Sequence, residues 1–397
     1  MSERSLHVLH VVPYFYPAWA YGGIPRLVYG LGRGLVESGV RVSVLTTDAF
    51  DAHSRSFLGL GQTRIEGIGV TILPNLSNRL AYRHQAFLPL GIESALRRID
   101  LAGVDLIHLH GHRNVLNYGV FRHARRRGIP CVMTPNGTLP PIERKIVAKK
   151  VFDLFFGEPV LRGIRRFIAV SRAEVAQFRA AGIPANRISL IPNGVDLAEF
   201  DPLPRRGLFR RRYGLDGHLI LYLGKLTPRK GVDHLIEAFA RIGRSDVTLV
   251  IAGNDMGIEG ELRAKVKRLA LGERVLFVGL LTGPERLAAL ADADVLAYPS
   301  TLEIFGLVPF EGLLAGAPAV VGDDCGCGEL VQEARAGVLV RYGDVRALSD
   351  ALHNLLDRPR VRRAMVERGR RFIRSRFAWS RVVPMTLNVY RAVLNEG

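Results

Sequence analysis

Short apolar runs, many of them rich in valine and isoleucine, alternate with amphipathic segments along almost the whole chain. Runs of this kind are typical of strands that are buried on both faces of a parallel sheet. The segments between them carry apolar residues at helical spacing, such as Leu27, Leu31 and Leu35 before Gly39. The pattern predicts a first series of strands at residues 6–12, 40–46, 70–73, 104–109, 129–133, 166–170 and 187–191, and a second series at 219–223, 247–251, 274–278, 295–298, 317–321 and 337–340.

A proline-containing pause at residues 200–207 separates the two series. Repeated strand–helix units imply parallel sheets with helices on both faces. The pattern therefore predicts an α/β protein with two doubly wound, Rossmann-like domains that face each other across a cleft. We expect the first domain at 1–200, the second at 201–376, and a C-terminal helix at 377–397 that crosses back to the first domain. Ligands of such folds bind beyond the carboxyl ends of the strands, so residues there are candidates for a site.

Composition narrows the class of protein without naming a function. The 397 residues are 48% hydrophobic, yet no run approaches the roughly 18 apolar residues that span a bilayer. The N-terminal apolar run contains two histidines and is followed by Pro13, which is not typical of a signal peptide. We expect it to form a buried strand. The three cysteines cannot build a disulfide framework, which favours a cytoplasmic protein.

The net charge of +18 comes from 55 Lys and Arg against 37 Asp and Glu. Such an excess indicates nucleic acid, anionic lipid or phosphorylated substrates as partners, or only solvated basic helices. The arginine-rich segment 358–376 lacks the interleaved aromatics of a nucleic-acid reader, so no nucleic acid is expected. Around residues 143–156, Glu143-Arg144-Lys145, Lys149 and Lys150 accompany three phenylalanines. That segment predicts either an interfacial helix on an anionic membrane or an ordinary helix whose phenylalanine face is core.

The most informative stretch is residues 300–311, where Glu303 and Glu311 bracket a predicted helix start. Pro309 suits a first helical position, and the helix is expected at residues 310–314. Free backbone amides at Gly306, Leu307 and Val308 would then form a seat for a phosphate. Two carboxylates beside an anion site make sense if the anion also carries hydroxyls, as a nucleotide-sugar does.

Lysines and glycines at other strand ends of the second series extend this picture. Lys225 and Lys230 flank a loop after the strand at 219–223. They would neutralise a diphosphate without a metal ion, or the loop is simply charged and solvated. No Asp-x-Asp pair stands at a strand end of the first domain, so no metal site is expected there. Gly253 and Val278 end two further strands, where main-chain groups would meet the edge of a base or only form βα turns.

Two features of the first series lie at strand ends. Gly22 and Gly23 open a helix, where they would let the backbone approach a phosphate or would simply form a tight turn. His108 and His110 share one strand face. Either one of them is a buried, hydrogen-bonded core histidine and the other is exposed, or His110 lies at the carboxyl end of the strand in the cleft. With His112 they are three closely spaced histidines, but no cysteine or carboxylate cluster accompanies them, so a metal site is not expected.

Together, these residues resemble the retaining glycosyltransferases of family four, which have the two-domain GT-B fold. The E-x7-E motif of Glu303 and Glu311 carries the resemblance, with Phe305-Gly306-Leu307 between the two glutamates. Supporting motifs follow in matching order over almost the whole chain, namely Gly22-Gly23, His110, Gly224-Lys225, Lys230-Gly231 and the segment 316–329. One departure is Lys225, where the family commonly has Arg, so a point charge replaces a bidentate fork.

The resemblance implies roles for these residues. The second domain would hold the donor nucleotide-sugar, with Lys225, Lys230 and the amides of residues 306–308 on the diphosphate. Glu311 would accept hydrogen bonds from the ribose, and Glu303 from the donor sugar. Gly22 and Gly23 would contact the phosphate from the first, acceptor-side domain, and His110 would lie near the reacting sugar.

The expected function is thus a metal-independent, retaining hexosyl transfer from a UDP- or GDP-linked sugar, with no cofactor. The acceptor would be a glycan or glycolipid in cell-surface polysaccharide or lipopolysaccharide biosynthesis. The enzyme would be cytoplasmic, with peripheral contact at the inner face of the membrane. Alternatives are a nucleotide-sugar epimerase or hydrolase on the same fold, and a non-enzymatic basic protein that binds membrane or nucleic acid.

Overall fold

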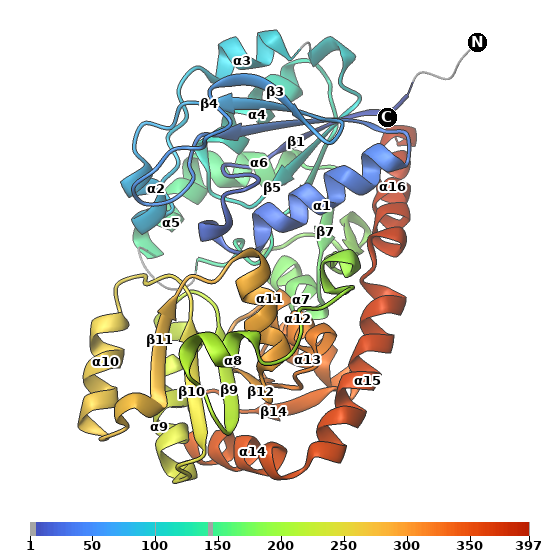
Figure 1. Cartoon of the computed structure of the whole chain (residues 1–397). Coiled ribbons are helices and arrows are strands. Elements are labelled where there is room, and N and C mark those ends of the chain that lie inside the picture. Colours follow the sequence, from blue (N-terminus) through green and yellow to red (C-terminus); the bar gives the residue numbers. More distant parts are fainter. Residues whose placement is uncertain (1–4, 100, 142–145, 397) are drawn as a thin grey trace. The chain divides into compact units, whose positions relative to one another are not determined.

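The computed structural model describes residues 5–99, 101–141 and 146–396, and the chain divides into two compact units (Figure 1). Unit 1 comprises Met1–Gly194 and Trp379–Gly397, and unit 2 comprises Val195–Ala378. Each unit contains one sheet with helices packed on it. The sheet of unit 1 is parallel except for one edge strand, and the sheet of unit 2 is wholly parallel. The predicted fold class, two doubly wound α/β sheets, is confirmed.

Unit 1 contains an eight-stranded sheet in the order β3-β4-β2-β1-β5-β6-β7-β8. All of its neighbouring strands are parallel except β3 and β4. The order places β1 and β5 side by side at the centre of the sheet, although they lie far apart in sequence. The strands are β1 (His7–Val11), β2 (Arg41–Thr47), β3 (Gly61–Ile65), β4 (Ile68–Leu73), β5 (Leu106–His110), β6 (Cys131–Thr134), β7 (Arg166–Ala169) and β8 (Ile188–Leu190).

The antiparallel edge strand β3 was not predicted from the apolar pattern. Its residues alternate between half-buried and exposed, so it contains no apolar run. It pairs with β4 through a tight turn at Glu66 and Gly67, whose φ angles are 46° and 85°. Two consecutive positive φ values fit the hairpin turns that match the twist of a sheet.

Helices cover both faces of the unit 1 sheet. One face packs against α3, α4, α6 and α7, and the other against α1 and α16. His10 of β1 and both histidines of β5 point to the second face, because Val8 and Leu106, which share their strand faces, belong to that core. The helices are α1 (Gly23–Glu37), α2 (Asn78–His84), α3 (Ile92–Arg98), α4 (Val115–Arg126), α5 (Ile146–Phe152), α6 (Glu158–Gly163), α7 (Arg172–Ala180) and α16 (Trp379–Asn395).

Glycines on α1 allow α16 to pack closely against it. A Cβ atom on Gly30 would lie 2.4 Å from the indole of Trp379, and one on Gly34 would lie 2.5 Å from Val383. These distances are shorter than any normal contact, so larger residues would push α16 away. Gly30 and Gly34 therefore serve the packing of α1 against α16.

Unit 2 contains a fully parallel six-stranded sheet in the order β11-β10-β9-β12-β13-β14. Its strands are β9 (His218–Leu223), β10 (Val247–Ala252), β11 (Val275–Gly279), β12 (Val295–Tyr298), β13 (Ala319–Gly322) and β14 (Gly337–Val340). Its helices are α8 (Leu208–Tyr213), α9 (Val232–Ile242), α10 (Glu259–Arg268), α11 (Gly283–Asp292), α12 (Leu307–Ala315), α13 (Gly326–Ala334), α14 (Val345–Asp357) and α15 (Pro359–Arg376).

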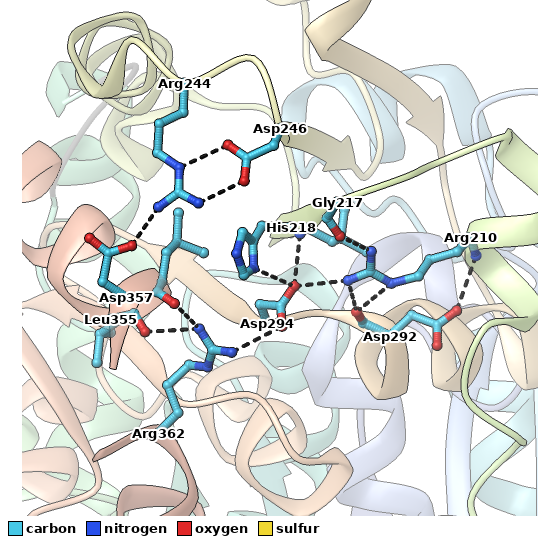
Figure 2. A network of polar contacts seen from close by, with 12 residues as sticks. Arg210, Gly217, His218, Arg244, Asp246, Asp292, Asp294, Leu355, Asp357 and Arg362 are labelled. Atoms are coloured by element: carbon cyan, nitrogen blue, oxygen red, sulfur yellow. Dashed lines mark hydrogen bonds and ion pairs between the residues drawn. The ribbon is translucent and has the colours of Figure 1, made fainter. Parts of the chain in front are cut away.

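A polar network at the start of β12 joins several elements of unit 2 (Figure 2). The carboxylate of Asp294 accepts from Arg210 on α8 at 2.8 Å, from the Leu219 amide of β9 at 3.0 Å, and from Arg362 on α15 at 3.3 Å. Nearby, Asp292 accepts from the Phe209 and Arg210 amides at the start of α8. The network lies at the amino end of β12. It therefore stabilises the side of the sheet opposite the carboxyl ends of the strands, where a ligand is expected.

The segment that suggested an interfacial helix is helical from Ile146 to Gly163, through α5, the π-helix η3 (Asp153–Gly157) and α6. Most of its apolar side chains up to residue 156 are exposed, with Val147 at 76% and Phe155 at 63%, whereas Phe152 is half-buried and Val160 is buried. The alternative in which the phenylalanine face is core is therefore wrong. Glu143, Arg144 and Lys145 lie outside the described residues. Within the described part of the chain, no helix is long and apolar enough to cross a membrane.

Candidate functional site

The N-terminus of α12 forms the centre of the polar site in unit 2. The helix begins at Leu307, earlier than predicted, and Gly306 is its N-cap, so Pro309 is the third helical residue rather than the first. The φ of Gly306 is 66°, and a Cβ there would lie 2.9 Å from Cys327 and 3.1 Å from Cγ of Glu303. Only glycine fits this position. The amides of residues 306–308 have no acceptor within the helix, which is the geometry of an anion seat.

Glu303 lies immediately before that seat and gathers four hydrogen-bond or ion-pair donors. Its Oε2 accepts from Lys230, from the Tyr298 hydroxyl at 3.1 Å and from Ser300 at 3.4 Å, and Arg229 lies 3.5 Å away. Lys230 is 6% exposed, and its ammonium also bonds to the Tyr298 hydroxyl. The structure thus brings together Glu303 and Lys230, two residues singled out in the sequence, and adds Tyr298 and Arg229, which sequence reasoning missed.

The charge state of Glu303 follows from this cluster. Burial by itself would raise the pKa of the carboxyl, but the positive charges of Lys230 and Arg229 outweigh it and lower the pKa to about 2. Glu303 is therefore ionised at neutral pH and acts as an acceptor. A carboxylate held in this way suits binding of sugar hydroxyls and does not suit proton donation.

Glu311, the second glutamate of the motif, contacts a different cation. Arg286 of α11 places its guanidinium 2.7 Å from Oε2 of Glu311 and 2.7 Å from Oε2 of Glu199. Both Arg286 and Glu311 are buried. Sequence reasoning did not identify Arg286. The only signal for it was an arginine at an inward position of an otherwise apolar helix face.

The remaining predicted residues of unit 2 lie at the carboxyl ends of neighbouring strands. Lys225 follows β9, and its carbonyl accepts from Tyr222 at 2.8 Å. Gly253 follows β10, where a Cβ would lie 1.7 Å from the carbonyl oxygen of Gly224, so the two loops touch backbone to backbone. Val278 is the penultimate residue of β11. The order β11-β10-β9-β12 sets these strand ends side by side with the loop that carries Glu303.

In unit 1, the two predicted features also lie at carboxyl ends of strands. Gly22 is the N-cap of α1 with a φ of 95°, and Gly23 is the first residue of that helix. His110 is the last residue of β5 and lines a cavity together with His108, Thr134 and Asn136. The cavity is closed on another side by Trp379 and other residues of α1 and α16.

Three buried histidines meet in unit 1, but they are not the three that are close in sequence. Nδ1 of His10 lies 2.9 Å from Nε2 of His110, and the two rings stack. His108 bonds to the Tyr390 hydroxyl at 2.6 Å and to Thr134 at 2.7 Å. Burial lowers the pKa of His10 to about 3 and that of His110 well below its ordinary value, so both rings are neutral at physiological pH.

The spacing of the three histidines is close enough for a metal site. The ligand atoms of His10, His108 and His110 all lie within 4.8 Å of one another. Both nitrogens of His108 are engaged by hydroxyl groups, and the His10–His110 pair uses one nitrogen from each ring. These bonds hold the three rings in a cluster, in which Nε2 of His10 is buried without a hydrogen-bond partner among the described residues. His112 contacts Asp153 at 3.2 Å instead and lies outside it.

Comparisons with known proteins agree on one family. A model described as "Glycosyltransferase Family 4" matches residues 21–199, and one described as "Glycosyl transferases group 1" matches residues 209–372. A D-inositol 3-phosphate glycosyltransferase of Acidothermus cellulolyticus is 30% identical to this chain. The match covers 94% of this chain and 86% of that protein. A GDP-mannose-dependent alpha-(1-6)-phosphatidylinositol monomannoside mannosyltransferase of Mycolicibacterium smegmatis is 32% identical. This match covers 62% of this chain and 71% of that protein. Among solved structures, Anabaena HepE in complex with UDP and glucose superposes with a TM-score of 0.75 at 20% identity, covering 98% of this chain and 100% of that chain.

Proposed function

This chain belongs to the family 4 glycosyltransferases (glycosyl transferases group 1), retaining enzymes with the GT-B fold, and on that basis we propose that it transfers a hexosyl group from a UDP- or GDP-linked donor without a metal ion. Family membership removes the non-enzymatic interpretation that rested on charge alone. The observation that carries the proposal is the juxtaposition of an ionised Glu303, Lys230 and the α12 N-terminus in one buried cluster.

The diphosphate of the donor would bind at the α12 N-terminus. The amides of residues 306–308 point outward from the helix start, and the helix dipole favours an anion there. An ammonium group has three donors, and the bonds of Lys230 to Tyr298 and Glu303 use two of them. Its third donor can reach phosphate without breaking the pair with Glu303. Lys225, at the neighbouring strand end, would supply a second positive charge.

The two glutamates would bind hydroxyl groups of the donor. Glu303 would accept from the sugar, because its carboxylate stays charged beside Lys230 and Arg229. Glu311 would accept from the ribose. Gly253 and Val278 would offer main-chain groups to the base. In this arrangement neither glutamate serves as the acid or the nucleophile of a glycosidase pair.

The reaction that these residues support is transfer with retention. The bond from C1 to the phosphate oxygen breaks while the acceptor hydroxyl attacks C1 from the same face, and the departing phosphate takes the acceptor proton. Positive charge and oriented amides stabilise the developing negative charge on the diphosphate. From unit 1, Gly22 and Gly23 would contact the phosphate, and neutral His110 would bond to the reacting sugar.

A glycan or lipid-linked acceptor at the inner face of the membrane, in cell-surface polysaccharide or lipopolysaccharide biosynthesis, completes the proposal. Two observations support it. The mannosyltransferase relative is named for a phosphatidylinositol-linked acceptor. In addition, the segment α5–η3 exposes Val147, Leu154 and Phe155 close to Lys149 and Lys150. This combination fits peripheral contact of a cytoplasmic enzyme with anionic lipid.

A nucleotide panel tests the donor assignment. We expect UDP or GDP, and the corresponding sugar nucleotides, to raise the Tm equally with and without a chelator. Mass spectrometry of products with and without candidate acceptors then separates transfer from hydrolysis or epimerisation. If no nucleoside diphosphate raises the Tm, the proposed donor site is wrong. A shift that disappears with chelator would contradict metal independence alone.

A further inference from the structure

Arg286 is a buried arginine that the mechanism above does not use. It lies on α11 with its side chain 5% exposed, and its guanidinium joins two carboxylates. Its Nη2 lies 2.7 Å from Oε2 of Glu199, and its Nη1 lies 2.7 Å from Oε2 of Glu311. The guanidinium also lies over the ring of Phe200, 5.9 Å from its centre. Burying an arginine costs free energy unless ion pairs and hydrogen bonds compensate for the lost hydration.

The two carboxylates differ in exposure. The Glu199 side chain is 37% exposed and can be solvated, whereas that of Glu311 is 10% exposed. Glu311 therefore depends more strongly on its contact with Arg286 for its direction. Its contact with Arg286 uses Oε2. A carboxylate offers about four acceptor positions over its two oxygens, so Oε1 keeps its capacity to accept.

From this geometry we propose that Arg286 is a positioning residue that aims the Glu311 carboxylate at the ribose and so sets selectivity for ribonucleotides over 2′-deoxyribonucleotides. The inference rests on the proposed ribose role of Glu311. A carboxylate fixed through one oxygen presents the other in a constant direction, and hydrogen bonds to an oriented charged group are the ones that discriminate. Without the guanidinium, Glu311 would lose the ion pair that fixes its direction.

Ligand binding measures this directly and does not require the acceptor. The dissociation constants of UDP, 2′-deoxy-UDP, GDP and 2′-deoxy-GDP are measured by calorimetry for the wild type, Arg286→Gln and Arg286→Lys. For whichever base binds, we expect the wild type to favour the ribose form by about tenfold or more, as for loss of a hydrogen bond to a charged group. Arg286→Gln should weaken the ribose form to the level of the deoxy form, which brings the ratio to about one. Arg286→Lys keeps the charge and should give an intermediate ratio.

Glu199→Gln is the matched control. It changes the other, more exposed partner of Arg286 and keeps an acceptor there, so the ribose-to-deoxyribose ratio should stay at the wild-type value. A merely structural role of Arg286 would weaken both forms equally and leave the ratio unchanged, which would overturn the proposal. If Arg286→Gln does not fold, an unchanged ratio in Arg286→Lys overturns it in the same way.

The outcomes also separate this inference from the proposed function. Tight ribonucleotide binding with no preference over the deoxy form would refute the roles of Arg286 and Glu311 while leaving the donor site intact. Absence of binding by UDP and GDP to the wild type would remove the donor site itself, and this inference with it.

Discussion

At the residue scale, the ammonium of Lys230 bonds to Tyr298 and Glu303 and lies 4.6 Å from the centre of the Tyr298 ring. Lys230→Ala removes the charge proposed to stabilise the leaving diphosphate. We expect turnover to fall by about 10²–10³-fold, as for loss of one group that stabilises a transition-state anion. Steady-state kinetics with the donor found by screening provides the measurement.

Lys265→Ala is the matched control for this change. Lys265 lies on α10 and pairs with Glu237, outside the Glu303 cluster, so its loss should leave turnover near the wild-type value. The two variants must both remain folded by circular dichroism. Near-normal turnover of Lys230→Ala would refute its assignment to the diphosphate.

The Glu303 carboxyl predicts a pH dependence of stability. Its pKa is lowered from 4.5 to about 2 in the folded chain, so the contribution to stability is present above about pH 4.5 and is lost as the pH falls toward 2. The Tm advantage of the wild type over Glu303→Gln should therefore be largest near neutral pH and should shrink in acid. A difference in Tm that does not change with pH would count against this ion pair.

The sequence identified Glu303, Lys230 and Gly306 because their types and spacing are local signals at strand ends and a helix start. It did not identify Arg286 or His10. The contact of Arg286 with Glu311 depends on how α11 packs beside α12, and the contact of His10 with His110 depends on β1 pairing with β5. Such contacts follow from strand order and helix packing, which the apolar pattern does not specify.

At the element scale, the packing of α16 on α1 can be tested at Gly30. A Cβ there would lie 2.4 Å from the rigid indole of Trp379, so Gly30→Ala should destabilise unit 1 by about 1–3 kcal/mol, less any gain in helix propensity. Gly260→Ala on α10 is the control, because nothing lies within 4 Å of its Cβ position. There we expect an unchanged or slightly higher Tm. Equal effects of the two changes would contradict the packing role.

The exposed apolar segment of α5 and η3 makes a second prediction at this scale. Phe155→Ser and Lys149→Glu should each weaken binding to vesicles that contain anionic lipid, and added salt should weaken wild-type binding. Sedimentation with anionic and with neutral vesicles measures this. Leu208→Ser, an exposed leucine on α8, serves as the control and should bind like the wild type. Binding that neither substitution nor salt alters would exclude this segment as the lipid contact.

At the scale of the whole molecule, the apolar pattern was sufficient to predict two parallel α/β sheets and every strand but β3. Central strands buried on both faces, such as β9 with its apolar residues 219–223, produce the strongest signal. β3 was missed because an edge strand with one solvated face contains mixed polar residues. The pattern does not reveal strand order, which sets β1 next to β5 and thereby assembles the histidine cluster.

The chain leaves unit 1 after Gly194 and re-enters it at Trp379, so unit 2 is inserted between the two chain segments that form unit 1. Its two ends lie side by side, since the Val195 amide donates to the Phe377 carbonyl at 2.7 Å and Val195 pairs with Ala378. Adjacent ends are the condition under which a segment can be excised or exchanged. We therefore expect residues 195–378 to fold as an independent polypeptide with its own cooperative thermal transition. If the donor binds to this unit as proposed, exchanging residues 195–378 between relatives at these two neighbouring junctions would also exchange donor preference.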